Sequence, residues 1–380
     1  MKTIHGIARA SIFLGAVSLM ACTKPVSQPD AESLRVDALF AEVDPQRQPG
    51  CSAGVIYGGE FLHRAGYGAA SLDYGVPLSS HSVFRLGSVS KQFTAMAILL
   101  LEEEGKLSLD DDVHEYLPQL VDYGYPVTLR QMLQHTSGMS DYEGDELAVF
   151  ANMNGEKFRW GNEDYLTVPE FLERLATVPL RTPPGTEYRY SNSAYFLLSQ
   201  VVEAASGESL HEYAKRRIFQ PLQMQQTLFN DNAYRVIPDR ATGYQKNAEG
   251  EYEVYETNLD WVGDGGIYTS IDDFIRWDRN FYRNTLGKGL QSLIVEMERP
   301  SALENYGLGL EIGDWQGLRT VQHSGSWVAF NTFYARIPEL EFSVVVFCNT
   351  EEIDAEEIGD KILEIYGPRI IGGEAGAGSE

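Results

Sequence analysis

Apolar and polar residues alternate at both ends of the chain in the manner of β-strands. Near the beginning, residues 51–57 and 61–68 form two such runs, and the adjacent glycines Gly58 and Gly59 separate them. Two alternating runs joined by a glycine turn predict a β-hairpin. Strand-like runs return after Tyr306 and cover residues 307–312, 320–323, 331–337 and 342–348.

The segments between these strands carry the spacing and the end signals of helices. Residues 88–105 predict a helix whose middle, 94–101, has no charged side chain on any face, so we expect it to be buried all round. Thr167, with Glu170 three residues later and Pro169 between them, is typical of a capping box that starts a helix. Further helices are predicted at residues 30–43, 128–135, 193–205 and 355–366.

These elements predict an α+β fold: one antiparallel sheet from the N- and C-terminal strands, flanked by helices, and a second, mainly helical lobe. We expect one folded domain at residues 33–366, in which 33–107 and 291–366 form the α/β lobe and 108–290 the helical lobe. A cleft between such lobes is where a small-molecule site is expected. The glycine-rich residues 367–380 predict a flexible tail.

The first residues predict export. Lys2 and Arg9 precede a short apolar run that ends at Cys22, and this end resembles a bacterial lipobox, so we interpret residues 1–21 as a lipoprotein signal peptide and Cys22 as the lipidated residue. Residues 22–32 would then be a tether to the membrane of the bacterial cell envelope, on the periplasmic side in a Gram-negative cell. An ordinary cleaved signal, in which Cys22 is incidental, is the alternative.

Composition narrows the classes of partner. The net charge is −25 and the chain has no basic run, which excludes nucleic acid as an expected partner. Cys51 and Cys348 belong to no CxxC or Cys/His cluster, so no metal site and no cofactor are indicated. The two cysteines either pair in an oxidising compartment or remain buried free thiols, and the sequence leaves both open. It does not indicate the oligomeric state.

The predicted buried helix begins with a serine and a lysine that favour nucleophilic chemistry. Ser88 and Lys91 are three residues apart, so a helix places them on one face within hydrogen-bonding reach. Burial and the positive helix end both favour a neutral lysine, which can take a proton from the serine hydroxyl. A helix-capping Ser88 beside a solvated Lys91 would give the same pattern, so this pair alone does not decide the function.

Three motifs and their flanks resemble the serine β-lactamase-like superfamily, which includes class C β-lactamases, DD-peptidases, D-aminopeptidases and related esterases. In the family's order, the motifs are Ser88-Val89-Ser90-Lys91, Tyr190-Ser191-Asn192 and His323-Ser324-Gly325. The flanks that match are Phe84-Arg85-Leu86-Gly87, the segment from Leu133 to Gly138 that contains His135, and Pro183-Pro184-Gly185. The resemblance covers residues 33–366 and identifies them as a catalytic domain of the β-lactamase and transpeptidase type.

The resemblance implies a role for each motif residue. It makes Ser88 the nucleophile, Lys91 its activating partner and Tyr190 a general base or acid. It makes Asn192, His323, Ser324, Gly325 and Ser326 the substrate-binding residues, with the backbone N–H groups of Ser88 and Ser326 as oxyanion donors. The segment around His135 would be structural. No Gly-x-Ser-x-Gly elbow occurs, which excludes an α/β-hydrolase triad.

The third motif begins with His323, where the β-lactamase pattern has a lysine. This difference leaves the class of substrate undetermined. A histidine titrates near ~6.5 and lacks the permanent charge that suits a substrate carboxylate. We therefore expect a serine hydrolase that forms an acyl-enzyme on Ser88 with a small-molecule, short-peptide or ester substrate, where the peptides contain a D-amino acid. Penicillin binding is compatible with this expectation. A true β-lactamase is one alternative. A non-catalytic envelope protein that binds a ligand in the same fold is another.

Overall fold

The computed structural model describes residues 30–142 and 166–373. Its main feature is a six-stranded antiparallel sheet in the order β10-β11-β12-β13-β1-β2. The strands come from both ends of the chain, as the sequence predicts: β1 (Cys51–Tyr57), β2 (Glu60–Tyr67), β10 (Glu311–Trp315), β11 (Leu318–Trp327), β12 (Phe330–Ile337) and β13 (Phe342–Cys348). The predicted antiparallel sheet is confirmed.

One predicted strand lies elsewhere. Residues 307–310 form turns and only β10, from Glu311, pairs with β11. Gly309 has φ +72, and a Cβ there would lie 2.7 Å from the backbone carbon of Lys91. The prediction of a strand over 307–312 is therefore wrong for its first part, because this loop packs under the start of the buried helix.

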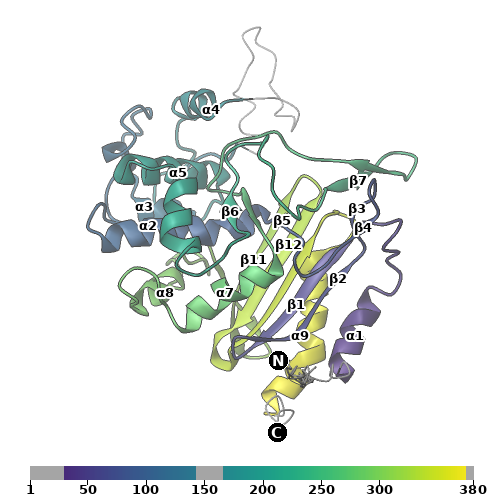
Figure 1. Cartoon of the computed structure of the whole chain (residues 1–380). Coiled ribbons are helices and arrows are strands. Elements are labelled where there is room, and N and C mark those ends of the chain that lie inside the picture. Colours follow the sequence, from purple (N-terminus) through teal and green to yellow (C-terminus); the bar gives the residue numbers. More distant parts are fainter. Residues whose placement is uncertain (1–29, 143–165, 374–380) are drawn as a thin grey trace, which may run out of the picture.

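Helices cover both faces of the sheet (Figure 1). On one face, α9 (Ala355–Ile371) packs on β12 and β13, and α1 (Ala31–Leu39) packs beside α9. On the other face, α7 (Ile271–Tyr282) contacts β1, β2 and β13. Strand alternation supplies both apolar faces of β13, since Val344 and Val346 join the cluster around α9 while Val345 and Phe347 join the larger core.

The remaining helices form the second layer. The helix α2 (Lys91–Glu103) contacts α5 (Asn192–Ser206), α6 (Leu210–Ala214) and α8 (Ser292–Met297). Every residue of α2 from Lys91 to Leu101 is buried, which confirms the expectation of burial on all sides. Within the described residues, the other helical elements are α3 (Leu129–Leu133), α4 (Val168–Leu175), 3-10 turns at η1 (Gly87–Ser90), η2 (Val113–Glu115) and η5 (Pro338–Leu340), and a π-helical turn at η4 (Lys215–Phe219).

The predicted lobe boundaries need correction. We predicted α7 in the helical lobe of residues 108–290, whereas it packs on the sheet. We predicted α2 in the α/β lobe of residues 33–107, whereas it packs among the helices. Both errors have one cause: chain order does not reveal which layer receives a helix whose neighbours in space are far away in sequence.

The predicted ends of the domain shift as well. The helix α9 continues to Ile371, so the tail does not begin at 367. Gly367 is not a helix stop; a Cβ there would lie 2.1 Å from the Trp315 ring, so the glycine makes room for that side chain. At the other end, Asp30 caps α1 and pairs with Arg369 of α9 at 2.5 Å, which brings the last residues of the predicted tether into the fold. The predicted signal peptide and Cys22 lie outside the described residues.

Three small sheets complete the architecture and were not foreseen. They are β3 (Ala69–Ser71) with β4 (Val76–Pro77), β5 (Phe84–Arg85) with β9 (Ile267–Thr269) and β6 (Leu228–Phe229), and β7 (Tyr244–Lys246) with β8 (Tyr252–Val254). The central strand of the three-stranded sheet, β9, pairs with β5 directly before the predicted nucleophile. This small sheet therefore fixes the chain that enters the predicted site.

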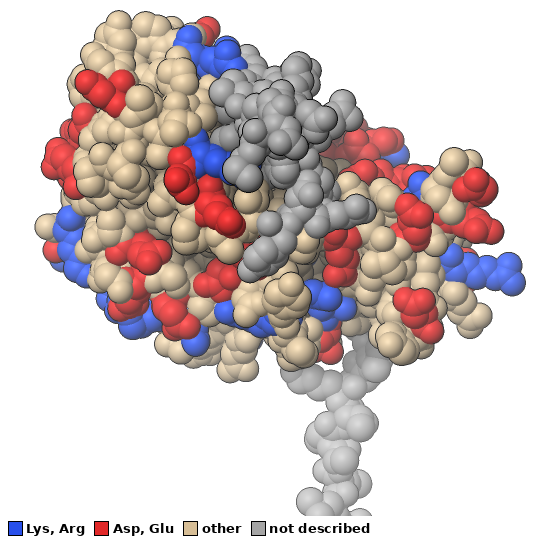
Figure 2. All heavy atoms as spheres, turned by 90° about the horizontal axis from the view of Figure 1, so that it is seen from above, with Lys and Arg blue, Asp and Glu red and all other residues tan. Residues whose placement is uncertain are grey.

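Cys51 and Cys348 form a disulfide, which resolves the alternative that the sequence left open. Cys51 is the first residue of β1 and Cys348 is the last residue of β13, and the antiparallel register pairs them directly. Within residues 30–142 and 166–373, no helix is both long and apolar enough to cross a lipid bilayer. Figure 2 shows acidic side chains spread over the face seen from above, with basic ones scattered among them, in line with the net charge of −25.

Candidate active site

Ser88 lies in a tight turn between β5 and α2. The turn is the 3-10 segment η1, and its first residue, Gly87, has φ +52. A Cβ on Gly87 would lie 2.8 Å from the backbone nitrogen of Ser326 in β11. Only glycine therefore combines this backbone conformation with so close an approach of β11.

Lys91 is buried at the first position of α2 and points at Ser88. Its Nζ donates to Ser88 Oγ at 2.9 Å, to Asn192 Oδ1 at 2.6 Å and to the Asp264 carbonyl oxygen at 2.8 Å. The Tyr190 hydroxyl donates to the same Ser88 Oγ at 2.8 Å. The structure thus brings together the four predicted residues Ser88, Lys91, Tyr190 and Asn192, and two of them are positioned to exchange a proton with the serine hydroxyl.

Asn192 is held by a residue that the sequence analysis missed. The carboxylate of Asp141 accepts from the backbone nitrogen of Asn192 at 3.2 Å and from its Nδ2 at 3.3 Å. Because Nδ2 faces this carboxylate, Oδ1 faces Lys91. Asp141 therefore fixes the amide orientation that Lys91 needs.

The segment around His135 positions the second motif. His135 is fully buried with φ 55, and its Nδ1 accepts from the backbone nitrogen of Ser191 at 3.1 Å. Its ring centroid lies 4.2 Å from that of Tyr190. Burial, followed by the charge of Lys91 and by His323, lowers the pKa of His135 well below its ordinary value, so the ring is neutral, as an accepting Nδ1 requires. His135 orients Tyr190 and does not contact Ser88 Oγ through any described hydrogen bond.

The third motif lies on β11, whose backbone packs against the turn that carries Ser88. A Cβ on Gly325 would lie 2.2 Å from the carbonyl oxygen of Leu86 and 3.0 Å from the backbone nitrogen of Ser88. Thr332 of β12 donates to the same Leu86 oxygen at 2.7 Å. Gly325 therefore serves as the point of contact between strand and turn, which places the backbone of Ser326 beside Gly87 and Ser88.

His323 differs from the sequence expectation. Its Nδ1 donates to the carbonyl oxygen of Ser324 at 2.6 Å, so Nε2 accepts from the Tyr306 hydroxyl at 2.9 Å. Burial, with a smaller effect of Lys91, lowers the pKa of His323 to about 3. Both ring nitrogens are engaged and the ring is neutral at neutral pH, so the expected substrate contact and partial charge are not supported. Nothing in the sequence indicates that Tyr306, from the loop before β10, reaches this ring.

Ser324 is also placed differently from the expectation. Alternation along β11 turns its side chain away from the face that carries His323 and Gly325. It lies near enough to Glu356, at the start of α9 on the opposite side of the sheet, to lower the pKa of that carboxyl slightly against the larger rise that burial causes. The prediction that the Ser324 side chain binds substrate is therefore not supported.

A small cavity of about 10 Å³ lies beside Ser88. It is lined by residues from η1, β5, the N-terminus of α5, the loop before β9 and the end of β11: Arg85, Gly87, Ser88, Tyr142, Asn192, Asp264, Gly265, Ser326 and Trp327. Asp264 is the acidic residue among them, and the Tyr142 hydroxyl donates to its Oδ2. The only signal for Asp264 in the sequence is the pair of glycines after it, which marks a tight turn.

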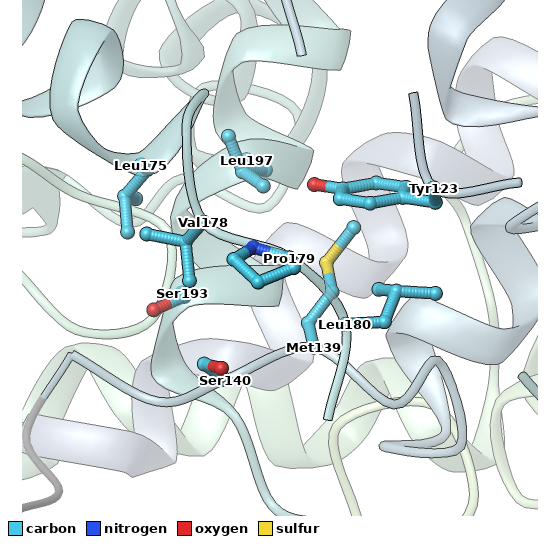
Figure 3. Close-up of a pocket in the computed structure, with 9 residues that line it drawn as sticks. All are labelled: Tyr123, Met139, Ser140, Leu175, Val178, Pro179, Leu180, Ser193 and Leu197. Atoms are coloured by element: carbon cyan, nitrogen blue, oxygen red, sulfur yellow. The ribbon is translucent and has the colours of Figure 1, made fainter. Parts of the chain in front are cut away.

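A second cavity of about 10 Å³ lies away from the nucleophile, on another side of α5. Figure 3 shows that its wall is mostly apolar, with Leu175, Val178, Pro179 and Leu197 around it and the hydroxyls of Ser140 and Ser193 at one side. Among residues 30–142 and 166–373, no group of three or more His, Cys, Asp and Glu side chains is arranged to hold a metal ion.

Comparisons with known proteins agree with this arrangement. A family model described as Beta-lactamase matches residues 36–366. Penicillin-binding protein 4* of Bacillus subtilis (strain 168) is 32% identical over 319 residues, which cover 78% of this chain and 67% of that protein. A D-aminopeptidase of Gluconobacter oxydans (strain 621H) is 29% identical over 327 residues, which cover 84% of this chain and 59% of the relative, so this chain corresponds to less than two thirds of that enzyme.

Among solved structures, an octameric penicillin-binding protein homologue from Pyrococcus abyssi is similar to this chain with a TM-score of 0.75 and 28% identity. The similarity covers 89% of this chain and 77% of that chain. The fold predicted from the three motifs is thereby confirmed.

Proposed function

The chain belongs to the beta-lactamase family, and from this membership and the geometry at Ser88 we propose that it hydrolyses its substrates through an acyl ester on Ser88. The observation that carries the proposal is the pair of contacts to Ser88 Oγ, from Lys91 Nζ at 2.9 Å and from the Tyr190 hydroxyl at 2.8 Å. A serine hydroxyl is a weak nucleophile until a neighbouring base removes its proton.

In the proposed acylation, neutral Lys91 takes the proton of Ser88 Oγ as this oxygen attacks the substrate carbonyl carbon. In the resting site Nζ donates to three acceptors, which requires the charged form, so Lys91 acts as the base after it has released one proton. Its burial disfavours the charged form and so favours this loss. The backbone N–H groups of Ser88 and Ser326 stabilise the oxyanion. Tyr190 then donates its proton to the leaving group, and Lys91 restores the Tyr190 proton. Water hydrolyses the ester in a second step.

We favour ester substrates and peptides that contain a D-amino acid over β-lactams. A neutral, fully engaged His323 offers no cation for the carboxylate of a penicillin. Peptide substrates are supported by the relative named as a D-aminopeptidase, and the relative named as a penicillin-binding protein agrees with a single acylation by a β-lactam. A true β-lactamase would turn over nitrocefin many times, whereas the proposed enzyme is acylated by it at most once on the time scale of the assay.

We also propose that the enzyme works outside the cytoplasm, held at a membrane by a lipid on Cys22. This proposal rests on the sequence alone, since residues 1–29 are outside the described part of the chain. Metabolic labelling with a palmitate analogue, compared between the wild type and Cys22→Ala, tests it.

The test of the function is Ser88→Ala with a p-nitrophenyl ester as substrate. We expect the rate of hydrolysis to fall by about a thousand-fold or more, because no other described group replaces the attacking oxygen. Ser90→Ala is the matched control, since its hydroxyl accepts from the Ile267 backbone nitrogen at 3.1 Å and does not contact Ser88 in any described bond. Equal activity of Ser88→Ala and wild type contradicts the proposal and favours the non-catalytic binding protein.

A further inference from the structure

The cavity beside Ser88 has the size and the lining of a water site. Its volume of about 10 Å³ corresponds to about one water molecule. Ser88 itself forms part of the wall, so an occupant lies next to the atom that carries the acyl group. A single water at this place would be adjacent to the ester that has to be hydrolysed.

Polar atoms without a hydrogen-bond partner belong to the residues of this wall. Asp264 Oδ1, Arg85 Nε and Trp327 Nε1 are buried and unpaired in the described structure. Asp264 and Arg85 are each 7% exposed. Buried polar atoms need partners, and an acyl methyl group in this cavity would leave an acceptor and two donors unpaired. A water molecule both accepts and donates, so the lining favours water over an apolar part of the substrate.

Hydrogen bonds hold Asp264 in place through its Oδ2 and its backbone oxygen, and Oδ1 has no hydrogen-bond partner in the described structure. Tyr142 donates to Oδ2, and Lys91 Nζ donates to the Asp264 backbone oxygen at 2.8 Å. Burial raises the pKa of the Asp264 carboxyl, while Lys91, the Tyr142 hydrogen bond and Arg85 oppose the rise. The net rise brings the pKa of this carboxyl nearer to neutral pH, where a general base is most effective.

We propose that this cavity holds the hydrolytic water and that Asp264 is the general base of deacylation. The inference rests on the proposed acyl-enzyme. The water oxygen attacks the ester carbonyl carbon while its proton passes to Asp264 Oδ1, and the bond from that carbon to Ser88 Oγ then breaks. Tyr190 returns a proton to Ser88 Oγ, the acid product leaves, and the proton held by Asp264 passes back to Tyr190 through solvent, which restores the resting site.

This assignment separates the two half-reactions. Lys91 and Tyr190 contact Ser88 Oγ, which is the leaving atom of deacylation, so they are positioned to return its proton. Asp264 and Ser88 line the same cavity, and no described hydrogen bond joins their side chains. A change at Asp264 Oδ1 therefore affects deacylation more than acylation.

The experiment is Asp264→Asn, mixed rapidly with p-nitrophenyl acetate. We expect a burst of about one p-nitrophenol per enzyme at nearly the wild-type rate, followed by turnover about 10²–10⁴-fold slower. Mass spectrometry of the quenched variant should find one acetyl group on Ser88 that persists, whereas in the wild type it decays within the turnover time.

Asp278→Asn is the matched control. Asp278 of α7 is also fully buried with one unpaired carboxylate oxygen, Oδ2, but it bonds to Tyr334 and Ser343 and does not line the cavity. We expect its deacylation rate to match the wild type. Trp327→Phe, which removes only the indole N–H from the wall, should slow deacylation more than acylation and serves if Asp264→Asn does not fold.

The outcomes separate this inference from the proposed function. An unchanged lifetime of the acetyl group in Asp264→Asn, or an equal loss of both rates, overturns the role of Asp264 while the acyl-enzyme stands. Hydrolysis that Ser88→Ala leaves intact overturns the proposed function itself.

Discussion

His323 is a neutral ring held between an acceptor and a donor. The carbonyl oxygen of Ser324 takes the proton of Nδ1, and the Tyr306 hydroxyl occupies Nε2. Protonation of Nε2 would place two donors against each other inside a buried site, beside Lys91. The third motif therefore shapes the wall behind Tyr190 and does not supply charge to it.

This state makes the folding stability depend on pH. The pKa of His323 is about 3 in the folded protein, against about 6.5 when unfolded, so between these values only the unfolded state binds the proton. Stability should fall as the pH falls below about 6.5, by up to about 1.4 kcal/mol per pH unit from this residue. In His323→Asn, the part of the pH dependence of the free energy of unfolding that His323 causes should be absent.

Urea unfolding of wild type and His323→Asn at about pH 7 and about pH 5 measures the difference. Both proteins retain the other buried histidines of the described residues, His63, His135 and His211, so the difference between the two proteins arises from the change at residue 323. An equal loss of stability in both proteins on acidification contradicts a neutral, buried His323.

Residue-level prediction succeeded where the chemistry lies in a short motif. Helical spacing suggested the pair of Ser88 and Lys91, and the resemblance of three short motifs to one superfamily nominated Tyr190 and Asn192 and assigned all four roles. Asp264 was not predictable in this way, because its contact with Lys91 joins residues 173 positions apart. The side-chain directions of His323 and Ser324 depended on Tyr306 and α9, which the motif does not contain.

At the scale of the elements, the hydrogen bonds at a helix end decide how a side chain contributes to stability, as two serines at the start of α5 show. Ser191 caps α5: its hydroxyl accepts from the Ala194 backbone nitrogen at 3.1 Å and donates to the Ser140 carbonyl oxygen at 3.1 Å. Ser193, two residues later, is buried at the cavity of Figure 3, and its hydroxyl has no hydrogen-bond partner in the described structure. The two serines differ in bonding although they share a helix.

We therefore expect opposite results from the same substitution. Ser191→Ala should lower the free energy of unfolding by about 0.5–2 kcal/mol, because it removes the cap. Ser193→Ala should leave it unchanged or raise it by about 1 kcal/mol, because it removes an unpaired buried hydroxyl. Thermal and urea unfolding of both variants provide the test; a larger loss for Ser193→Ala would show that its hydroxyl has a partner.

Elements with strong end signals were predictable and very short ones were not. Thr128 and Thr167 both form the capping boxes that start α3 and α4, and the glycine at 207 ends α5. The strands β5, β6 and β9 have two or three residues each. Such runs are too short to show a period of two, and they are stabilised by pairing with distant partners.

At the scale of the whole molecule, the sheet joins the two ends of the chain. The first strand, β1, lies between the hairpin partner β2 and the last strand, β13. The Cys51–Cys348 disulfide links these strands across a sequence separation of 297 residues. The sequence predicted both strand regions, but only the register of β1 and β13 shows that the two cysteines meet.

Removal of this disulfide should destabilise the protein. Cys51→Ala combined with Cys348→Ala should lower the free energy of unfolding by about 2–5 kcal/mol, since an unfolded chain without the link has more conformational freedom. The melting temperature of the wild type should fall in a reductant strong enough to open a buried bond, and that of the double variant should not respond. A wild type whose melting temperature equals that of the double variant without reductant contradicts the link.

The same bond makes a closed covalent ring of the chain between Cys51 and Cys348. All the motif residues from Ser88 to Ser326 lie inside this ring. A protease that cuts one loop of the ring opens it but separates no fragment, so strands and helices on both sides of the cut stay in one molecule. At the location outside the cytoplasm that we propose, a single nick would then leave the nucleophile and its partners at the high local concentration that lets them reassemble.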